Sequence, residues 1–474
     1  MNAKPSASGH PRAGAPQRAT GPQGELSTPQ TGSPGLPPAA SFDALGLPPE
    51  LTKTMVGLGV TEPFPIQAAT LPNALAGRDV LGRARTGSGK TLAFGLALLV
   101  RIAGVRAESK RPLALVLVPT RELAQQVNDA LAPYAQTLKV RLATVVGGLS
   151  INRQQAALRT GVDVLIATPG RLADLVSRRD CLLNQVRITV LDEADQMCDL
   201  GFLPQVTEIL DQVPSDGQRL LFSATLDRNV DQLVRDYLHD PVLASLDPAA
   251  GSVTTMDHHV LNIHAADKYA TATEIAARDG RVLMFLDTKA GVDQFTRHLR
   301  ASGVRAAALH SGKSQPQRTH TLGQFKDGEI TVLVATNVAA RGIHIDTLDL
   351  VVNVDPPADA KDYLHRGGRT ARAGESGTVV TLVTPNQRRD VNRMMSEAGI
   401  RPTVTQVRSG EAQLTAITGA KRPPTPTGTK ANSGNAPFRG LGSRAGRPAK
   451  ESRKAAEARK AAEARAAARV RRGR

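Results

Sequence analysis

Short runs of β-branched and aliphatic residues alternate with longer segments whose apolar residues recur at helical spacing, beginning at Phe42. Alternation of strands with helices predicts a parallel sheet that helices cover on both faces. The strands predicted in the first series lie at 79–84, 113–120, 163–170, 188–195 and 219–225.

A second series of alternating strands and helices follows the first. Its predicted strands lie at 281–288, 304–310, 331–337, 349–357 and 377–384. The simplest interpretation is an α/β fold of two domains in tandem, joined near residues 240–260. We place the first domain at 41–247 and the second at 248–405.

The two ends of the chain differ in composition from this central part. Residues 1–40 are rich in Pro and Gly and nearly free of large apolar residues, which predicts a disordered extension. Residues 406–474 form a basic low-complexity tail in which RKAAEA occurs twice, at 453–458 and 459–464. In these repeats Glu and Arg or Lys lie three or four residues apart, where they can pair on a solvated helix. Disorder is an equal alternative.

Charge points to the kind of partner. The chain carries 60 Lys and Arg against 43 Asp and Glu, a formal charge of +17, and its pI is near 10.3. Residues 421–474 hold sixteen Lys and Arg against three Glu, so most of the excess lies in the tail. Such a balance favours a polyanionic partner, nucleic acid before membrane.

Cysteine content and hydropathy bear on location. The two cysteines, Cys181 and Cys198, show neither metal-ligand spacing nor a disulfide framework, which suits a reducing compartment. No stretch approaches the ~20 apolar residues that a membrane-spanning helix needs, and the N-terminus lacks the apolar core of a secretory signal. We therefore expect a soluble, cytoplasmic protein that does not enter the membrane.

Residues 84–91, ARTGSGKT, lie between a predicted strand and an apolar helix. A glycine-rich loop in this context can cradle phosphates with its backbone N–H groups, although its first position is Ala84 rather than the usual Gly. Lys90 would reach the β- and γ-phosphates, and Thr91 would ligate Mg²⁺. The alternative is a glycine-rich turn without function. The predicted nucleotide-binding residues of this loop are Thr86, Gly87, Ser88, Gly89, Lys90 and Thr91.

An acidic turn, DEAD at 192–195, ends the predicted strand segment at 188–195. Clustered carboxylates repel one another unless a cation or a proton intervenes. Asp192 is suited to holding Mg²⁺, and Glu193 to orienting or deprotonating an attacking water. An acidic turn alone is more often a solvated helix cap, but about 100 residues after a Lys-Thr phosphate loop the catalytic interpretation is favoured.

These motifs, and others in the same order over residues 41–405, make the chain similar to DEAD-box ATP-dependent RNA helicases, specifically to bacterial members with a basic C-terminal tail. That family accepts Ala at the first position of the phosphate loop. The resemblance implies two RecA-like domains, ATP and Mg²⁺ as cofactors, and RNA as the partner.

The resemblance also assigns nucleotide contacts outside the loop. It implies that Phe42 stacks on adenine and that Gln67 pairs with the base edge, while Arg369 and Arg372 reach the γ-phosphate from the second domain. His344 stands where the family has an aspartate that contacts the ribose, and Asn337 replaces another aspartate in the same segment. We expect ribose discrimination to be relaxed. Phe64 replaces the usual Thr before Pro-Ile-Gln, which removes one polar contact near the phosphate loop.

Further roles follow from the resemblance alone. The residues implied to contact the RNA backbone are Thr120, Arg121, Gly148, Thr168, Pro169, Gly170, Arg171, Gln315, Arg318 and Thr336. Those implied to couple the ATP site to the second domain are Asp195, Ser223, Thr225 and His365. Backbone recognition predicts binding that is largely independent of RNA sequence.

The expected activity is RNA-stimulated ATP hydrolysis that drives local, non-processive unwinding of RNA duplexes or remodelling of RNA–protein complexes. Two alternatives remain: a DNA-directed helicase, and an ATP-gated RNA clamp or scaffold with weak turnover. Ribonucleoprotein or ribosome-assembly partners fit the class, and we expect a monomer.

Overall fold

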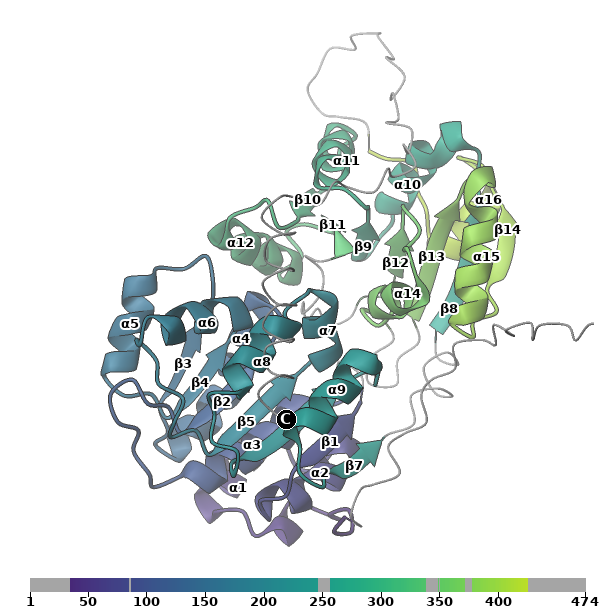
Figure 1. The fold of residues 1–474 in the computed structure, drawn as a ribbon. Helices are drawn as coiled ribbons and strands as arrows, with labels where there is room; N and C mark the ends of the chain where they lie inside the picture. Colours follow the sequence, from purple (N-terminus) through teal and green to yellow (C-terminus); the bar gives the residue numbers. More distant parts are fainter. Residues whose placement is uncertain are drawn as a thin grey trace, which may run out of the picture. The chain divides into compact units, whose positions relative to one another are not determined.

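The computed structural model describes residues 35–84, 87–245, 256–337, 348, 350–370 and 377–424. Its strands form two seven-stranded sheets, one in each half of the chain (Figure 1), and the strand pairs within both sheets are parallel. The predicted disorder of residues 1–34 and the helix-or-coil alternative for 453–464 lie outside the described residues. None of the described helices is long and apolar enough to cross a bilayer.

The first sheet has the strand order β3-β4-β2-β5-β6-β1-β7. Its strands are β1 (Val80–Arg83), β2 (Ala114–Leu117), β3 (Leu142–Val145), β4 (Val164–Ala167), β5 (Ile188–Asp192), β6 (Gln218–Ser223) and β7 (Val242–Ser245). The connecting helices are η1 (Asp43–Leu45), α1 (Pro49–Gly57), α2 (Pro65–Leu75), α3 (Lys90–Ile102), α4 (Arg121–Thr137), α5 (Ile151–Arg159), α6 (Pro169–Ser177), α7 (Ala194–Asp199), α8 (Leu203–Leu210) and α9 (Arg228–Tyr237).

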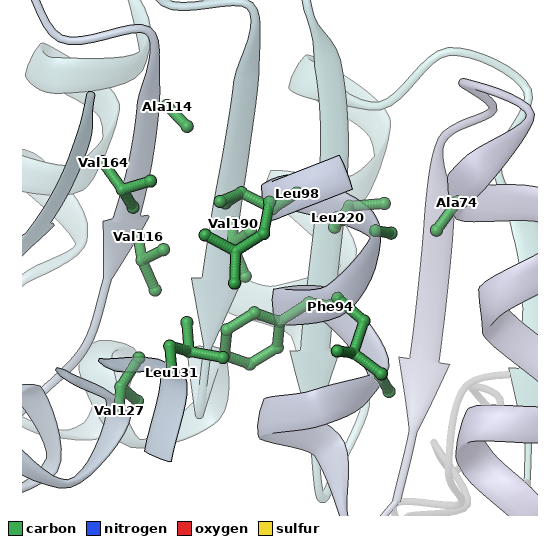
Figure 2. Packing of buried hydrophobic residues seen from close by; sticks show 14 of the residues in the cluster. Ala74, Phe94, Leu98, Ala114, Val116, Val127, Leu131, Val164, Val190 and Leu220 are labelled. Atoms are coloured by element: carbon green, nitrogen blue, oxygen red, sulfur yellow. The ribbon is translucent and has the colours of Figure 1, made fainter. Parts of the chain in front are cut away.

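Both faces of the first sheet are buried, because alternate residues of each central strand enter two different apolar clusters. Val190 of β5 belongs to the cluster that includes α3 and α4, and the adjacent Leu191 belongs to the cluster on the other face. Figure 2 shows Phe94 of α3 among the side chains of the first cluster, together with Leu131 and Val190. The continuous apolar runs that predicted these strands are therefore the signature of a sheet covered on both sides.

The second sheet has the order β10-β11-β9-β12-β13-β8-β14. Its strands are β8 (Met256–Asn262), β9 (Val282–Phe285), β10 (Ala306–Leu309), β11 (Val332–Ala335), β12 (Leu350–Asn353), β13 (Gly377–Val383) and β14 (Thr403–Gln406). The helices are η2 (Ala265–Asp267), α10 (Lys268–Ala276), α11 (Lys289–Ala301), α12 (Gln315–Lys326), α14 (Ala360–Gly367), η3 (Pro385–Gln387), α15 (Arg388–Glu397) and α16 (Ala412–Thr418).

All ten predicted strands are present, and the four that the sequence pattern missed are β3, β7, β8 and β14. β14 is mostly exposed and β7 alternates buried and exposed residues, so neither carries the apolar run that marked the central strands. β7 belongs to the first sheet and β8 to the second, so the connection between the domains lies in 246–255, outside the described residues.

Both predicted ends of the ordered region need correction. The second domain does not end at residue 405: Val407, Leu414 and Ala420 are buried in its core, and β14 pairs with β8. The predicted extension also overlaps ordered structure, because the Ala39 N–H donates to the Ala68 carbonyl in α2 at 2.9 Å. The sequence pattern missed this end of the domain because α16 is short and β14 is exposed. Neither has an apolar periodicity that distinguishes it from a low-complexity tail.

Candidate functional site

The predicted chemical residues gather at the carboxyl edge of the first sheet. The phosphate loop follows β1, the acidic turn follows β5 and the Ser223–Thr225 segment follows β6. These three strands are neighbours in the order β5-β6-β1, so their ends lie side by side. Ligands of open parallel sheets bind at this edge.

The described part of the phosphate loop has a backbone that only glycine adopts easily. Gly87 and Gly89 have φ angles of 89° and 90°, in the left-handed region. A Cβ on Gly89 would lie 2.6 Å from Gln67 Nε2 and 2.8 Å from Phe64 Cδ2, so a side chain at position 89 would displace both. Helix α3 begins directly afterwards, at Lys90. Ser88 and Thr91 are partly exposed here, and Thr86 lies outside the described residues.

Lys90 joins the phosphate loop to the acidic turn. Its buried Nζ donates to the Ala84 carbonyl and to Glu193 Oε1, both at 3.0 Å. Burial alone would lower the pKa of Lys90, but the carboxylates of Glu193 and Asp192 outweigh it, so the pKa lies above its usual value. An ammonium has three N–H donors, so a third remains for a phosphate oxygen. The site therefore holds a fixed positive charge at the start of a helix.

Asp192 and Glu193 lie beside this cation at the end of β5. Asp192 is 2% exposed, and burial raises its pKa to about 7, with Lys90 working against the shift and Glu193 adding to it. Glu193 has φ 53°, an uncommon left-handed conformation for a residue with a side chain. Strained backbone of this kind is typical of functional sites.

The donor set suits Mg²⁺ bound together with a phosphate. Among the described residues, no three His, Cys, Asp or Glu side chains converge into a metal cage. Mg²⁺ is usually held by one or two carboxylates, waters and substrate phosphates rather than by such a cage. One buried carboxylate at Asp192, whose charged form burial disfavours, is the kind of group that a divalent cation would stabilise.

Asp195 connects the acidic turn to the end of β6. It is fully buried, and its Oδ2 accepts hydrogen bonds from the Thr225 N–H at 3.0 Å and the Thr225 hydroxyl at 2.8 Å. The Ser223 hydroxyl accepts from the Asp195 N–H at 3.3 Å, and His365 Nε2 of α14 lies 3.9 Å from Asp195 Oδ2. The structure thus brings together the four residues predicted to couple the two domains.

Both residues predicted to bind adenine are buried in the first domain. Phe42 is 3% exposed and belongs to the first-domain core, and its stacking on adenine stays a prediction. Gln67 is 1% exposed: its Oε1 accepts from the Phe64 N–H at 2.9 Å, and its Nε2 donates to the Gly89 carbonyl at 3.0 Å. Gln67 therefore ties the start of α2 to the phosphate loop.

The predicted γ-phosphate and ribose contacts are only partly described. Arg369 is 6% exposed, and its Nε donates to the His365 carbonyl at 3.4 Å. Arg372 and His344 lie outside the described residues, while Asn337 and Thr336 follow the end of β11. The catalytic role of the two arginines stays a prediction.

The first-domain residues predicted to contact RNA follow β2, β3 and β4, the other half of the same sheet edge. Thr120 caps α4 and Thr168 precedes α6, where Pro169 and Gly170 form the first turn. The Arg121 guanidinium lies against Gly148, because a Cβ added to Gly148 would be 1.9 Å from Arg121 Nη1. Arg171 Nη1 donates to the Leu149 carbonyl at 3.1 Å. Helix starts and arginines of this kind suit phosphate recognition.

Glu122, next to Arg121 in the sequence, contacts two predicted RNA-binding residues of α12. Its Oε1 accepts from Gln315 Nε2 at 2.9 Å and lies 3.0 Å from Arg318 Nη2. Arg121 Nη1 also donates to Gln315 Oε1 at 3.4 Å. The four residues form one polar cluster drawn from both halves of the chain.

Lys361 is a residue of this region that sequence motifs did not indicate. Its Nζ donates to Asp199 Oδ1 at 2.8 Å and to Asp227 Oδ2 at 2.7 Å. These partners are 162 and 134 residues away in the sequence, and no motif links them. Their only local signal is the position of Asp227 as the N-cap of α9, just after Thr225.

Comparisons with known proteins agree with this arrangement. The family described as DEAD/DEAH box helicase matches residues 64–233, and the helicase conserved C-terminal domain matches 267–374. The chain is 40% identical over 368 residues to "Probable ATP-dependent RNA helicase ddx17" of Dictyostelium discoideum, covering 76% of this chain and 46% of the relative. It is 40% identical over 372 residues to "ATP-dependent RNA helicase DBP2" of Debaryomyces hansenii, covering 76% of this chain and 69% of the relative.

A solved structure shares the fold. The structure described as "S. cerevisiae Dbp5 bound to RNA and ADP BeF3" matches with a TM-score of 0.71 and 31% identity, covering 78% of this chain and 96% of that one. The chain spans about half to two thirds of the two curated relatives. Both are eukaryotic proteins, so the closer likeness to bacterial members stays a prediction.

Proposed function

Because this chain belongs to the DEAD-box family of ATP-dependent RNA helicases, we propose that it couples ATP hydrolysis to local, non-processive unwinding or remodelling of RNA duplexes or RNA–protein complexes. The observation that carries the proposal is the buried contact of Lys90 with Glu193, which joins the phosphate loop to the acidic turn at one sheet edge. A fixed cation and a carboxylate side by side can hold a phosphate chain and a water that attacks it.

Each residue of this edge has a defined task in the proposed reaction. Lys90 binds the β- and γ-phosphates and stabilises the charge that develops on them. Glu193 orients the attacking water and accepts its proton. Thr91 and Asp192 would hold Mg²⁺, which supplies positive charge to the phosphate oxygens when bound.

Coupling to the second domain rests on the contacts of Asp195. Its carboxylate holds Thr225 and lies near His365, on the helix that precedes Arg369. We propose that Arg369 and Arg372 complete the site when ATP and RNA draw the domains together. Half of the ATP site would then lie on each domain, so turnover would require closure.

RNA binding is proposed to run along the sheet edge through Thr120, Arg121, Gly148 and Arg171, and to continue through Gln315, Arg318 and Thr336. These groups suit phosphates and 2′-hydroxyls and carry no base code. The basic C-terminal residues would add salt-dependent affinity. We further propose a cytoplasmic, monomeric protein of bacterial type that acts on ribonucleoprotein or ribosome-assembly intermediates.

The test compares ATP hydrolysis and short-duplex unwinding with RNA and with DNA of equal length. RNA should stimulate hydrolysis and DNA should not, and Glu193→Gln should abolish turnover. Glu208→Gln, on an exposed position of α8, is the matched control and should behave as the wild type. Equal stimulation by DNA would favour the DNA-directed alternative, and turnover that survives Glu193→Gln would contradict the assigned role.

A further inference from the structure

One face of α14 is held to the second sheet by buried hydrogen bonds. Tyr363 and Arg366 lie three residues apart on the same side of this helix, and their side chains are 0% and 3% exposed. The Tyr363 hydroxyl lies 2.8 Å from Nδ1 of His258, in β8. Arg366 Nη1 donates to Asn353 Oδ1 at 3.2 Å, and Asn353 Nδ2 donates to the Thr381 hydroxyl at 3.1 Å. These partners lie on β12, β13 and β8, which are neighbours in the sheet.

The direction of each bond in this chain follows from Arg366, because a guanidinium can only donate. Asn353 must present its oxygen to Arg366 and its NH₂ group to Thr381. The Thr381 hydroxyl accepts that bond, so its own proton is available to Tyr363. Burial raises the pKa of Tyr363, and the hydrogen bond with Thr381 opposes that rise. The Tyr363 proton then points to His258, whose Nδ1 is the acceptor at the end of the chain.

His258 is in the protonation state that this chain of bonds requires. Its side chain is 9% exposed, and burial lowers its pKa, although the nearby Asp257 opposes the shift. The ring is therefore neutral at pH 7, with its proton on Nε2 and a lone pair on Nδ1. An apolar side chain at position 258 would leave the buried Tyr363 hydroxyl without an acceptor, which is costly inside a protein.

The opposite face of α14 carries residues that the proposed reaction uses. Lys361, His365 and Arg369 follow one another at intervals of four residues, so they share one side of the helix. Arg369 continues the last turn, because its N–H donates to the Arg366 carbonyl at 3.2 Å. His365 Nε2 lies 3.9 Å from Asp195 Oδ2, and Lys361 bonds two carboxylates of the first domain. Because both faces belong to one helix, fixing the buried face also fixes the direction of the other.

We infer that His258 is a positioning residue for ATP hydrolysis: through Tyr363 it sets the rotation of α14 and thereby the approach of Arg369 to the γ-phosphate. His258 is not among the predicted nucleotide or RNA contacts, so its contribution lies in the orientation of the helix. The inference rests on the proposed function and adds to it a residue of β8 that no motif indicates.

The experiment measures kcat for ATP hydrolysis at saturating RNA, and the dissociation constant of ADP, with the full chain and Mg²⁺. His258→Leu should lower kcat at least about 5-fold, because it leaves the buried Tyr363 hydroxyl without an acceptor. The affinity for ADP should not change, since ADP has no γ-phosphate for Arg369 to meet. His258→Gln keeps an acceptor for Tyr363 and should restore kcat to within about twofold of the wild type. His264→Leu, at an exposed position after β8, is the matched control and should change neither quantity.

Tyr363→Phe tests the same bond from the other side and keeps the packing of the ring. It should lower kcat as His258→Leu does, with ADP binding retained. The double variant should be little slower than either single variant, because each substitution removes the same bond. Should His258→Leu unfold, Tyr363→Phe and His258→Gln together provide the comparison.

Other outcomes would overturn the inference. A wild-type kcat in both His258→Leu and Tyr363→Phe would refute the positioning role. Equal losses of kcat and of ADP affinity would show general damage to the fold, and a His258→Gln variant as slow as His258→Leu would show that the acceptor is not what matters. A wild-type chain without RNA-stimulated hydrolysis would refute the proposed function itself, whereas failure of the inference alone leaves wild-type turnover intact.

Discussion

Lys361 offers a direct test of how the two halves of the chain cooperate. Its ammonium bonds Asp199 and Asp227 at 2.8 and 2.7 Å from helix α14, which also carries His365 near Asp195. Burial would lower the pKa of Lys361, but the hydrogen bonds to the two carboxylates raise it above its usual value, so the group stays charged. We predict that Lys361→Gln weakens the closed arrangement.

The free-energy loss expected for Lys361→Gln follows from the burial of Lys361 and from the number of hydrogen bonds that it makes. Hydrogen bonds to charged groups contribute about 1.5–3 kcal/mol, and exposed ion pairs about 0–1 kcal/mol. The side chain of Lys361 is 25% exposed, and Asp227 keeps its bonds from the Asn229 and Val230 N–H groups. A loss of about 1–2 kcal/mol is therefore expected, which is roughly a 5- to 30-fold change in an equilibrium constant.

The assay titrates ATP hydrolysis with an RNA oligonucleotide. Because closure and RNA binding are linked, the RNA concentration for half-maximal stimulation should rise by about that factor, while the rate at saturating RNA changes little. Lys326→Gln, on the exposed end of α12, is the control and should leave the curve unchanged. In a double-mutant cycle, Asp199→Asn and Lys361→Gln should fall short of additivity, since each removes the same bond. A half-saturation within about twofold of the wild type, or strict additivity, would refute the reasoning.

Three further predictions concern other parts of the chain. Asp163→Asn should lower the free energy of unfolding at pH 7 by about 3 kcal/mol, because the side chain is 1% exposed and paired with Arg141, while Asp174→Asn, at a side chain that is 39% exposed, should cost at most about 1 kcal/mol. Burial raises the pKa of Asp163, but the hydrogen bonds from Arg141 and from nearby N–H groups lower it by more, so the pKa lies below its usual value. The stabilisation by Asp163 is therefore complete above the unfolded pKa of 3.8 and should be lost as the pH falls below it. Denaturant melts at a series of pH values would measure this loss. Gly89→Ala should weaken ADP binding in calorimetry because its φ of 90° disfavours a side chain and a Cβ would displace Gln67 and Phe64, whereas Gly323→Ala, whose Cβ meets nothing within 4 Å, should retain it. Turnover with 2′-deoxy-ATP and 3′-deoxy-ATP should approach that with ATP, since His344 replaces the ribose-contacting aspartate of the family; a strong loss with both analogues would reject relaxed discrimination.

The central strands could be predicted from sequence because they are buried on both faces and carry unbroken apolar runs. Val190 and its neighbours in β5 are such a case, and the acidic turn was placed correctly because it follows that strand. The edge strand β14 has exposed polar residues and owes its position to pairing with β8, a long-range contact with no local pattern.

The residues of the candidate site also fall into those that a local motif predicts and those that only the packing of the folded chain places. Gly87, Gly89 and Lys90 could be predicted because one short motif specifies both the glycine backbone conformation and the positive charge. The covering of Phe42 by the core and the exposure of Phe64 depend on how α2 packs, which no local spacing reveals. Lys361 was missed for a related reason, since its partners come from two other helices whose position only the folded chain determines.

The packing of α16 bears on how the basic tail can be deleted. A protein shortened after residue 405 would lose the buried side chains Val407, Leu414 and Ala420 and would disturb the pairing of β14 with β8. Bared strand edges and apolar surface promote aggregation, so weaker RNA binding by such a protein would report damage to its core rather than loss of the tail's charge. Cutting after Pro424 keeps these side chains and removes most of the excess cations.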